Sequence, residues 1–365
     1  MVNKLVLENL KHRPIRTLLT AFSIGMQVMM ILTLVGLSRG MLEDSANRAR
    51  SAGAHIWVRP PGSSVISFSS AGMSEKIVEY FRNEPGVNLV TGAVIQPIGG
   101  LNTVTGIDLE EFDRISGGFR YLAGGPFKGT EDEVIVDEYY SKQNNKRVGD
   151  TIELLNRDWR IVGIVEQGKM ARIFLPIRTL QDLTSTTGKL SQVLIQLDDP
   201  ARTDEFVERW RELLPDYRIY SIEELTSLYQ IDNVPGLNAF ITVIIGLSIV
   251  LGFAVVSLTM YAAVLERTRE IGVLKALGAS PGYIVGILLR ETAILALVGW
   301  AAGVVLTYVA RWAIVTLVPA SLNAVIVPEW WPIAAAIALC GALLGAVYPG
   351  LKAARQDAIE ALAYD

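Results

Sequence analysis

Histidine and cysteine are almost missing from this sequence of 365 residues, which contains two histidines and one cysteine. His12, His55 and Cys340 lie far apart along the chain. Zinc sites are built largely from clustered histidine and cysteine ligands, so the sequence provides no support for a zinc centre, and we expect no bound metal. A single cysteine also excludes a disulfide within the chain.

A phosphate-binding loop is also missing, because no run of the form G-x-x-x-x-G-K-[ST] occurs. Any ATP that drives this protein would therefore be bound by another polypeptide, and we expect no cofactor in the chain itself. Residues 36–40 match G-x-S-x-G, but an apolar segment precedes them and no histidine follows late in the chain. A hydrolase elbow needs a strand and a late histidine, so we interpret this match as chance.

An excess of positive charge is the third absence. The net charge is −4 at neutral pH, which argues against nucleic acid as a partner. Hydrophobic residues make up 51% of the chain and charged residues 19%, and the mean hydropathy is +0.36. The apolar residues are clustered, so the composition indicates a few membrane spans and one polar domain.

Three runs without a charged residue, 17–37, 237–265 and 292–310, are long enough to cross a bilayer as helices. The hydrocarbon core is about 30 Å thick, and about 20 helical residues cross it. A fourth span is predicted from Trp330 to about Leu351. The sequence therefore predicts one span, a large external domain and then three spans.

The uncharged stretch at 312–328 is predicted to be an external loop that can include a short re-entrant helix. Pro319 interrupts it, and another crossing would place Lys352 and Arg355 outside, against the positive-inside tendency. Lysines and arginines before the first span place the N-terminus inside by the same rule.

Two features of the later spans need an interpretation. Arg290 and Glu291 are expected near the inner interface, where they could reach a partner or a lipid headgroup. The glycine pairs 299/303 and 341/345 form G-x-x-x-G faces, which let helices approach closely. We favour packing between spans of one chain over a dimer interface.

The expected fold is an α-helical membrane protein with four transmembrane helices and an α+β extracytoplasmic domain inserted between helices one and two. A helix from Arg16 to Arg50 would be about 50 Å long, so it should project from the bilayer as a stalk. The predicted parts are an interfacial amphipathic helix (1–16), the first span and its stalk (17–50), the extracytoplasmic domain (51–225), a second stalk and span (226–265), a short helix between spans (266–279), the third and fourth spans (280–351) and a cytoplasmic tail (352–365).

Within the polar domain, runs of β-branched and aromatic residues bounded by turn residues predict strands. Predicted strands lie at 55–58, 87–98, 103–107, 134–136 and 193–197, a predicted hairpin joins 151–155 to 159–165 around 156–158, and predicted helices lie at 74–84, capped by Ser74, and at 203–214.

The charged stretch from Glu266 to Ala279 lies between two predicted spans and has a helical pattern. Ile271, Leu274 and Leu277 recur at a spacing of three residues, which predicts one apolar face. Oppositely charged residues at 266 and 269, and at 267 and 270, can pair along the helix. Gly278 is a suitable residue to follow a helix end, and Ser280-Pro281 predicts the start of the next helix.

The sequence ERTREIGVLKALGAS at 266–280 resembles the coupling-helix signature of the FtsX/MacB-like ABC transporter permeases. Weaker likenesses to the same family occur at 9–20, at 104–108, 133–136 and 148–152 in the polar domain, and in the tail at 352–365. The resemblance implies an ATPase-coupling helix that includes Glu266, Arg267, Arg269, Glu270, Ile271, Gly272, Leu274, Lys275, Leu277 and Gly278.

The resemblance further implies a permease subunit in the bacterial cytoplasmic membrane, in contact with its lipids. Two copies, in a homodimer or a heterodimer of permeases, would pair with separate cytoplasmic ATPase subunits. ATP-driven motion would then reach the external domain through the spans, for efflux or for handling of lipoproteins, peptides or lipids. A periplasmic adaptor is a further partner that some members use.

Two other interpretations remain open at this point. A non-transporting regulator of an external partner, such as a cell-wall hydrolase, would share every motif. A membrane-anchored enzyme would need catalytic groups in the external domain. Paired carboxylates such as Asp198 and Asp199 are interpreted as solvated loop residues, so we expect no catalytic site and the chain is not interpreted as an enzyme.

The predicted topology can be tested by labelling cysteines in intact cells. Cysteines placed at Ser63 and Ser185 should react with an impermeant thiol reagent from outside, whereas a cysteine at Ser280 should be protected, because positive charge orients the adjoining spans inward. Labelling of position 280 from outside would contradict this topology.

Overall fold

A computed structural model of the chain describes residues 14–63, 72–99, 102–128, 132–234, 236–317 and 324–356. Residues 1–13 of the predicted interfacial helix and residues 357–365 of the predicted tail lie outside the described residues. Two compact units divide the chain. The helical unit contains residues 1–40, 235–318 and 322–365, and the mixed unit contains residues 41–234 with 319–321.

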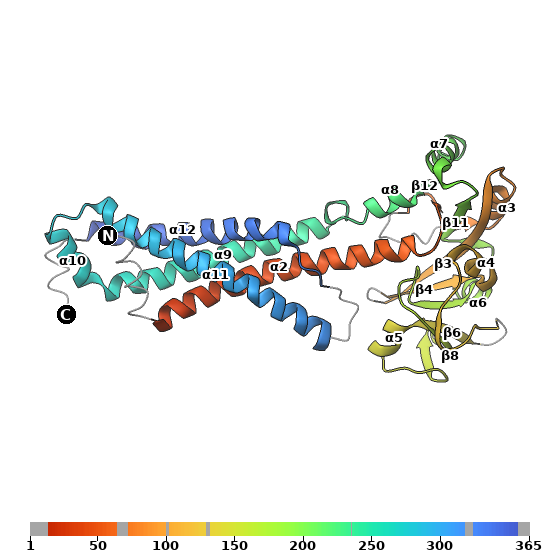
Figure 1. The fold of residues 1–365 in the computed structure, drawn as a ribbon, viewed down its shortest axis with the longest axis horizontal. Helices are drawn as coiled ribbons and strands as arrows, with labels where there is room; N and C mark the ends of the chain where they lie inside the picture. The colour runs from red at the N-terminus through yellow and green to blue at the C-terminus, as the bar shows by residue number, and fades with distance from the viewer. Residues whose placement is uncertain are drawn as a thin grey trace. The chain divides into compact units, whose positions relative to one another are not determined.

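Long apolar helices form the helical unit (Figure 1). They are α2 (Pro14–Arg50), which continues into the mixed unit, α9 (Leu237–Glu266), α11 (Pro281–Leu317) and α12 (Trp331–Arg355), with the short α10 (Thr268–Ala276) between α9 and α11 and the 3₁₀ turn η3 (Pro328–Trp330) before α12. Within the described residues, four helices are long and apolar enough to cross a membrane. This result confirms the predicted number of spans.

Helix α11 is longer than the predicted third span. It continues to Leu317, so residues 312–317, which were predicted to belong to a loop, are helical. The residues from 312 to 317 contain no proline, and the first strong helix breaker beyond them is Pro319. The side chain of Arg311, within α11, donates a hydrogen bond to the carbonyl of Ala324 at 2.8 Å.

Glycines let the spans of this chain approach one another closely. A Cβ atom at Gly299 would lie 2.7 Å from the Cβ of Ile24, and one at Gly303 would lie 2.6 Å from the Cβ of Val28. A Cβ at Gly345 would lie 2.8 Å from the carbonyl oxygen of Phe253 in α9. These contacts confirm packing between spans of one chain at Gly299, Gly303 and Gly345, whereas a Cβ at Gly341 would lie 3.9 Å from the carbonyl oxygen of Ile249.

The mixed unit is built on a ten-stranded sheet with the order β12-β1-β11-β3-β4-β9-β6-β8-β5 and with β7 paired to β8. Its strands are β1 (Ile56–Arg59), β3 (Val87–Gly99), β4 (Asn102–Ile107), β5 (Tyr121–Gly124), β6 (Glu133–Asp137), β7 (Thr151–Leu154), β8 (Arg157–Val165), β9 (Ile173–Pro176), β11 (Gln192–Leu197) and β12 (Arg218–Ser221), and β2 (Met73–Ser74) pairs with β10 (Lys189–Leu190) apart from it. The pairs β4/β9 and β6/β8 are parallel, and the other pairs are antiparallel.

Short helices complete the mixed unit, which confirms the predicted α+β class. They are α3 (Lys76–Arg82), α4 (Leu109–Ser116), α5 (Glu138–Gln143), α6 (Ile177–Leu183), α7 (Thr203–Leu213) and α8 (Ile222–Ser227), with the 3₁₀ turns η1 (Pro200–Arg202) and η2 (Ile231–Asn233). The segment predicted as a second stalk is not one continuous helix, because α8 ends at Ser227 and α9 begins after Gly236.

Two predicted elements, the hairpin and the helix at 74–84, differ in local detail from the structure. The β7/β8 hairpin is confirmed, but its turn is formed by Leu155 and Asn156, whose φ values of 54° and 58° suit the two-residue turns that match strand twist. The predicted cap Ser74 lies in strand β2. Helix α3 begins two residues later, at Lys76, and its amide donates to the Ser74 hydroxyl at 3.4 Å.

Charged side chains join the last turns of α2 to the sheet inside the mixed unit. The Asp44 carboxylate accepts a hydrogen bond from Arg48 at 2.6 Å and another from Arg172 at 3.4 Å. The Arg172 guanidinium also lies 4.3 Å from the ring centroid of Tyr139. Asp137, at the end of β6, is 2% exposed, and burial raises its pKa from 3.8 to about 6, against the opposing effect of the Tyr140 amide, Arg172 and Arg48.

Stability of the mixed unit should therefore depend on the charge of Asp137. A carboxyl whose pKa is raised on folding contributes stability that is lost as the pH rises through about 4 to 6, because the folded state binds its proton more tightly. Asp137→Asn removes this titration but can still accept the helix-capping bond from the Tyr140 amide.

We expect the free energy of unfolding of Asp137→Asn, relative to wild type, to rise by on the order of 3 kcal/mol between about pH 4 and about pH 7. Tryptophan fluorescence of the full chain in detergent measures the unfolding transition. Glu153→Gln, at an exposed position, is the control, and its free energy of unfolding relative to wild type should not change with pH. Equal pH dependence of wild type and Asp137→Asn would contradict the role of Asp137.

Candidate functional site

Helix α10 is delimited by the local signals that its sequence carries. Helix α9 ends at Glu266, and Arg267, with φ −110°, breaks the helical path before α10 begins. At the other end, the amide of Gly278 donates a hydrogen bond to the carbonyl of Lys275, and the amide of Ala279 donates one to the carbonyl of Leu274. This is the hydrogen-bond pattern of a Schellman cap. Gly278 has a φ of 94°, which favours glycine at this position.

The start of the following helix is also as predicted. Pro281 is the first residue of α11, and the Ser280 hydroxyl accepts a hydrogen bond from the amide of Tyr283 at 3.3 Å. The segment between the two spans is therefore a helix with a defined end and a capped exit.

The structure divides the predicted apolar face of α10 between two environments. Ile271 is 7% exposed and packs inside the helical unit, Leu274 is half-buried, and Leu277 is 81% exposed. Six residues turn an α-helix by about 600°, which leaves the first and last about 120° apart. The predicted face is therefore partly buried within the chain, and contact of all three residues with an ATPase stays a prediction.

An exposed apolar pair remains at the C-terminal end of α10, where Leu277 follows the last helical residue. Val273, which is 44% exposed, and Leu277 lie four residues apart and thus on one side of the helix. The exposed Arg269 and Glu270 lie one turn before them. Sequence reasoning missed Val273, although its spacing from Leu277 was the available signal. We call Val273 and Leu277 the exposed pair.

A cleft of about 360 Å³ lies between the end of α9, helix α10 and the start of α11. Most of its lining is apolar, and Arg267 and Glu270 contribute its charged groups. Ala263, Val264, Ile271, Val273, Leu274, Ile284, Ile287 and Leu288 form the apolar part. The cleft and the exposed pair share Val273, so apolar surface continues from the cleft to the exposed side of α10.

Two other predicted site residues, Lys275 and Gly272, make their contacts within the chain. The Lys275 ammonium donates to the carbonyl of Ala354 at 2.8 Å and to the carbonyl of Gln356, so it caps the end of α12. A cation there satisfies carbonyl groups that lack partners in the helix and interacts favourably with its dipole. Gly272, next to Ile271, is buried as well.

Arg267 makes its strong contact outside α10. Its guanidinium lies 3.0 Å from a carboxylate oxygen of Glu291 in α11, and the other oxygen of Glu291 lies 3.3 Å from Arg16 in α2. Arg16 also lies 3.5 Å from Glu266. Glu291 is 0% exposed, so the prediction that it reaches a partner or headgroup is wrong.

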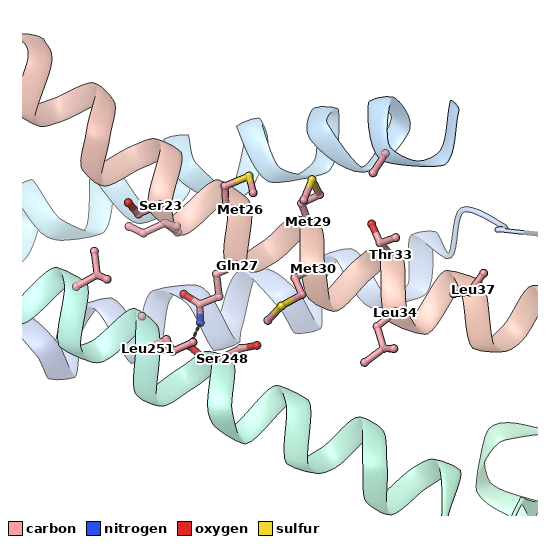
Figure 2. A pocket seen from close by; sticks show the side chains of 14 residues that line it. Ser23, Met26, Gln27, Met29, Met30, Thr33, Leu34, Leu37, Ser248 and Leu251 are labelled. Carbon is pink, nitrogen blue, oxygen red and sulfur yellow. Dashed lines mark hydrogen bonds between the residues drawn. The ribbon is translucent and has the colours of Figure 1, made fainter. Parts of the chain in front are cut away.

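A second cavity, of about 560 Å³, lies in the helical unit and is lined by α2 and α9 with Ala310 of α11 (Figure 2). Met26, Met29 and Met30 contribute flexible apolar side chains to it. Gln27 crosses to α9 and donates to the carbonyl of Ser248 at 2.6 Å. Sequence reasoning missed this cavity, and the methionines at 26–30 were its one visible signal.

In the part of the chain that the structure describes, no group of three or more histidine, cysteine, aspartate or glutamate side chains could hold a metal ion. The Ser38 of the G-x-S-x-G match is buried within helix α2, not on a turn after a strand. What these described residues can do is pack helices, present the exposed pair and hold a buried charge.

Comparison with known proteins adds two family matches. The MacB-like periplasmic core domain matches residues 17–213, and the FtsX-like permease C-terminal domain matches residues 242–358. The macrolide export ATP-binding/permease protein MacB of Escherichia coli is 23% identical over 99% of this chain and 60% of its own length. An ABC transporter permease of Methanocaldococcus jannaschii is 23% identical over 97% of this chain and 96% of its own length.

The chain thus spans about 60% of the length of the MacB relatives that it matches. Among solved structures, the periplasmic region of MacB from Actinobacillus actinomycetemcomitans covers 51% of this chain and 97% of its own, at 15% identity and a TM-score of 0.38. The two family matches lie side by side in the sequence, and the first alone covers more than half of it. This chain therefore belongs to the family of MacB-like and FtsX-like ABC transporter permeases.

Proposed function

We propose that this chain is the permease subunit of an ABC transporter, placed in the bacterial cytoplasmic membrane with both termini inside. A separate cytoplasmic ATPase binds helix α10, and its ATP-driven motion is transmitted through the spans to the extracytoplasmic domain. Permeases of this family work with a cytoplasmic ATPase. The observation that carries the proposal is the exposed pair on a capped helix between two spans.

The exposed pair suits docking because an amphipathic helix binds a groove mainly through apolar anchors at helical spacing. Leu277 is 81% exposed although it is a leucine on a helix that otherwise buries Ile271. Burial of one leucine side chain in a partner is worth about 1.5–3 kcal/mol. The Lys275 cap and the Ile271 contacts hold the helix in place, so that Val273 and Leu277 are presented on a fixed scaffold.

Leu277→Asp should release the ATPase, because it replaces an apolar anchor by a charge that the interface would bury without a partner. We expect the amount of ATPase that co-purifies in mild detergent, normalised to inserted permease, to fall by about tenfold or more. Arg269→Ala, which removes an exposed charge of the same helix, should have little effect.

Leu213→Asp provides the matched control, since Leu213 is 58% exposed on α7 of the mixed unit and lies far from α10 in the sequence. It should leave co-purification unchanged. Full ATPase binding by Leu277→Asp together with loss of binding by Arg269→Ala would show that the helix acts through its charges, against the proposal.

The chain purified without its partner should hydrolyse no ATP above background, because it lacks a phosphate-binding loop. Phosphate release in detergent and in lipid measures this. When the co-purifying ATPase is added, ATP should be hydrolysed, and the rate should differ from that of the ATPase without the permease. Hydrolysis that stays with the chain through stringent purification would contradict the assignment of ATP binding to another subunit.

A further inference from the structure

Glu291 is a buried carboxylate of the helical unit, in the third turn of α11. Its side chain is 0% exposed, and its neighbour Thr292 is buried as well. A charged carboxylate in such a place is costly unless partners within the protein neutralise it. No step of the proposed docking uses this residue, and it does not belong to the exposed pair.

The partners of Glu291 come from two other elements. Arg267, 7% exposed, occupies the corner between α9 and α10 and binds one carboxylate oxygen at 3.0 Å. Arg16, near the start of α2, binds the other oxygen at 3.3 Å. One carboxylate therefore joins the corner that carries α10 to α2, through α11.

We propose that Glu291 is a positioning residue that transmits displacement of α10 to α2. Breaking a buried pair leaves an uncompensated charge, so the three elements must shift together or lose a strong interaction. Helix α2 is continuous from Pro14 and has no further proline, so a shift of Arg16 is passed to the span that follows it. The coupling part of this proposal rests on the proposed function, because the ATPase supplies the displacement.

Three ion pairs lie near α10, and the two that involve Glu291 are less exposed to water than the third. The pair of Arg16 with Glu266 is half exposed, with a side-chain exposure of 47% for Glu266, and an exposed pair contributes little. Arg290, next to Glu291, is exposed. The pairs of Glu291 with Arg267 and Arg16 are the ones that water cannot replace.

Glu291→Gln removes the charge but keeps the shape of the side chain, and Arg16→Gln removes the connection of Glu291 to α2 together with the half-exposed pair of Arg16 and Glu266. In the complex with the co-purifying ATPase, both variants should still bind the ATPase, because Val273 and Leu277 are unchanged. Stimulation of ATP hydrolysis by the permease should fall about fivefold or more in each, within the usual range of coupling between sites. The double variant should lose no more than Glu291→Gln alone, because Arg16 acts on coupling through its pair with Glu291.

Arg290→Gln is the matched control, since it removes an exposed charge from the next position of the same helix, and it should leave binding and stimulation at wild-type values. Additive losses in the double variant, or equal losses in Arg290→Gln, would overturn the proposal.

A measurement without the ATPase separates this proposal from the proposed function. Spin labels at positions 22 and 277 of the full chain, in a Cys340→Ala background, report the distance between α2 and α10 by pulsed electron resonance. Glu291→Gln and Arg16→Gln should broaden the distance distribution, and Arg290→Gln should not. An unchanged distribution in Glu291→Gln overturns the proposal, whereas a broadened one with no ATPase bound to wild type would refute only the proposed function.

Discussion

The buried carboxylate of Glu291 constrains the helical unit more than any single apolar contact does. Apolar side chains can slide against one another at modest cost, but a buried charge needs its partners at hydrogen-bond distance. Arg267 and Arg16 supply them at 3.0 and 3.3 Å, and this fixes where α10 and the start of α2 lie against α11. The exposed pair on α10 depends on that placement, since the same corner orients Ile271 inward and Leu277 outward.

Helix α2 is held by charge near both of its ends. Arg16 near its start binds Glu291 in the helical unit, and Asp44 and Arg48 near its end belong to the charged cluster of the mixed unit. Between them the helix contains a long apolar stretch against which Gly299 and Gly303 pack closely.

Sequence alone predicted features that are encoded locally. The uncharged run 237–265 became α9, and Gly278, Ser280 and Pro281 formed the cap and start that their residue types favour. Hydrophobic length and capping act within a few residues, so neighbouring sequence contains the necessary information. The resemblance of the stretch at 266–280 agreed with the family that the whole chain belongs to.

Features that depend on distant residues could not be predicted in this way. Arg16 and Glu291 are 275 residues apart in the sequence, and no local pattern joins them. The side of α10 that faces inward is decided by its packing against the spans, so periodicity could not separate Ile271 from Leu277. The four-residue strand β9 gains its place by parallel pairing with β4, about seventy residues earlier, which its own short run of residues does not reveal.

The most direct test of the central claim is the reactivity of single cysteines on α10 with and without the ATPase. In a Cys340→Ala background, Leu277→Cys should react rapidly with a thiol reagent in the permease alone and become protected in the complex, while Ile271→Cys should react slowly in both. Such a pattern would show that the exposed pair is the surface that the ATPase covers. Equal reactivity of Leu277→Cys with and without bound ATPase would contradict the account.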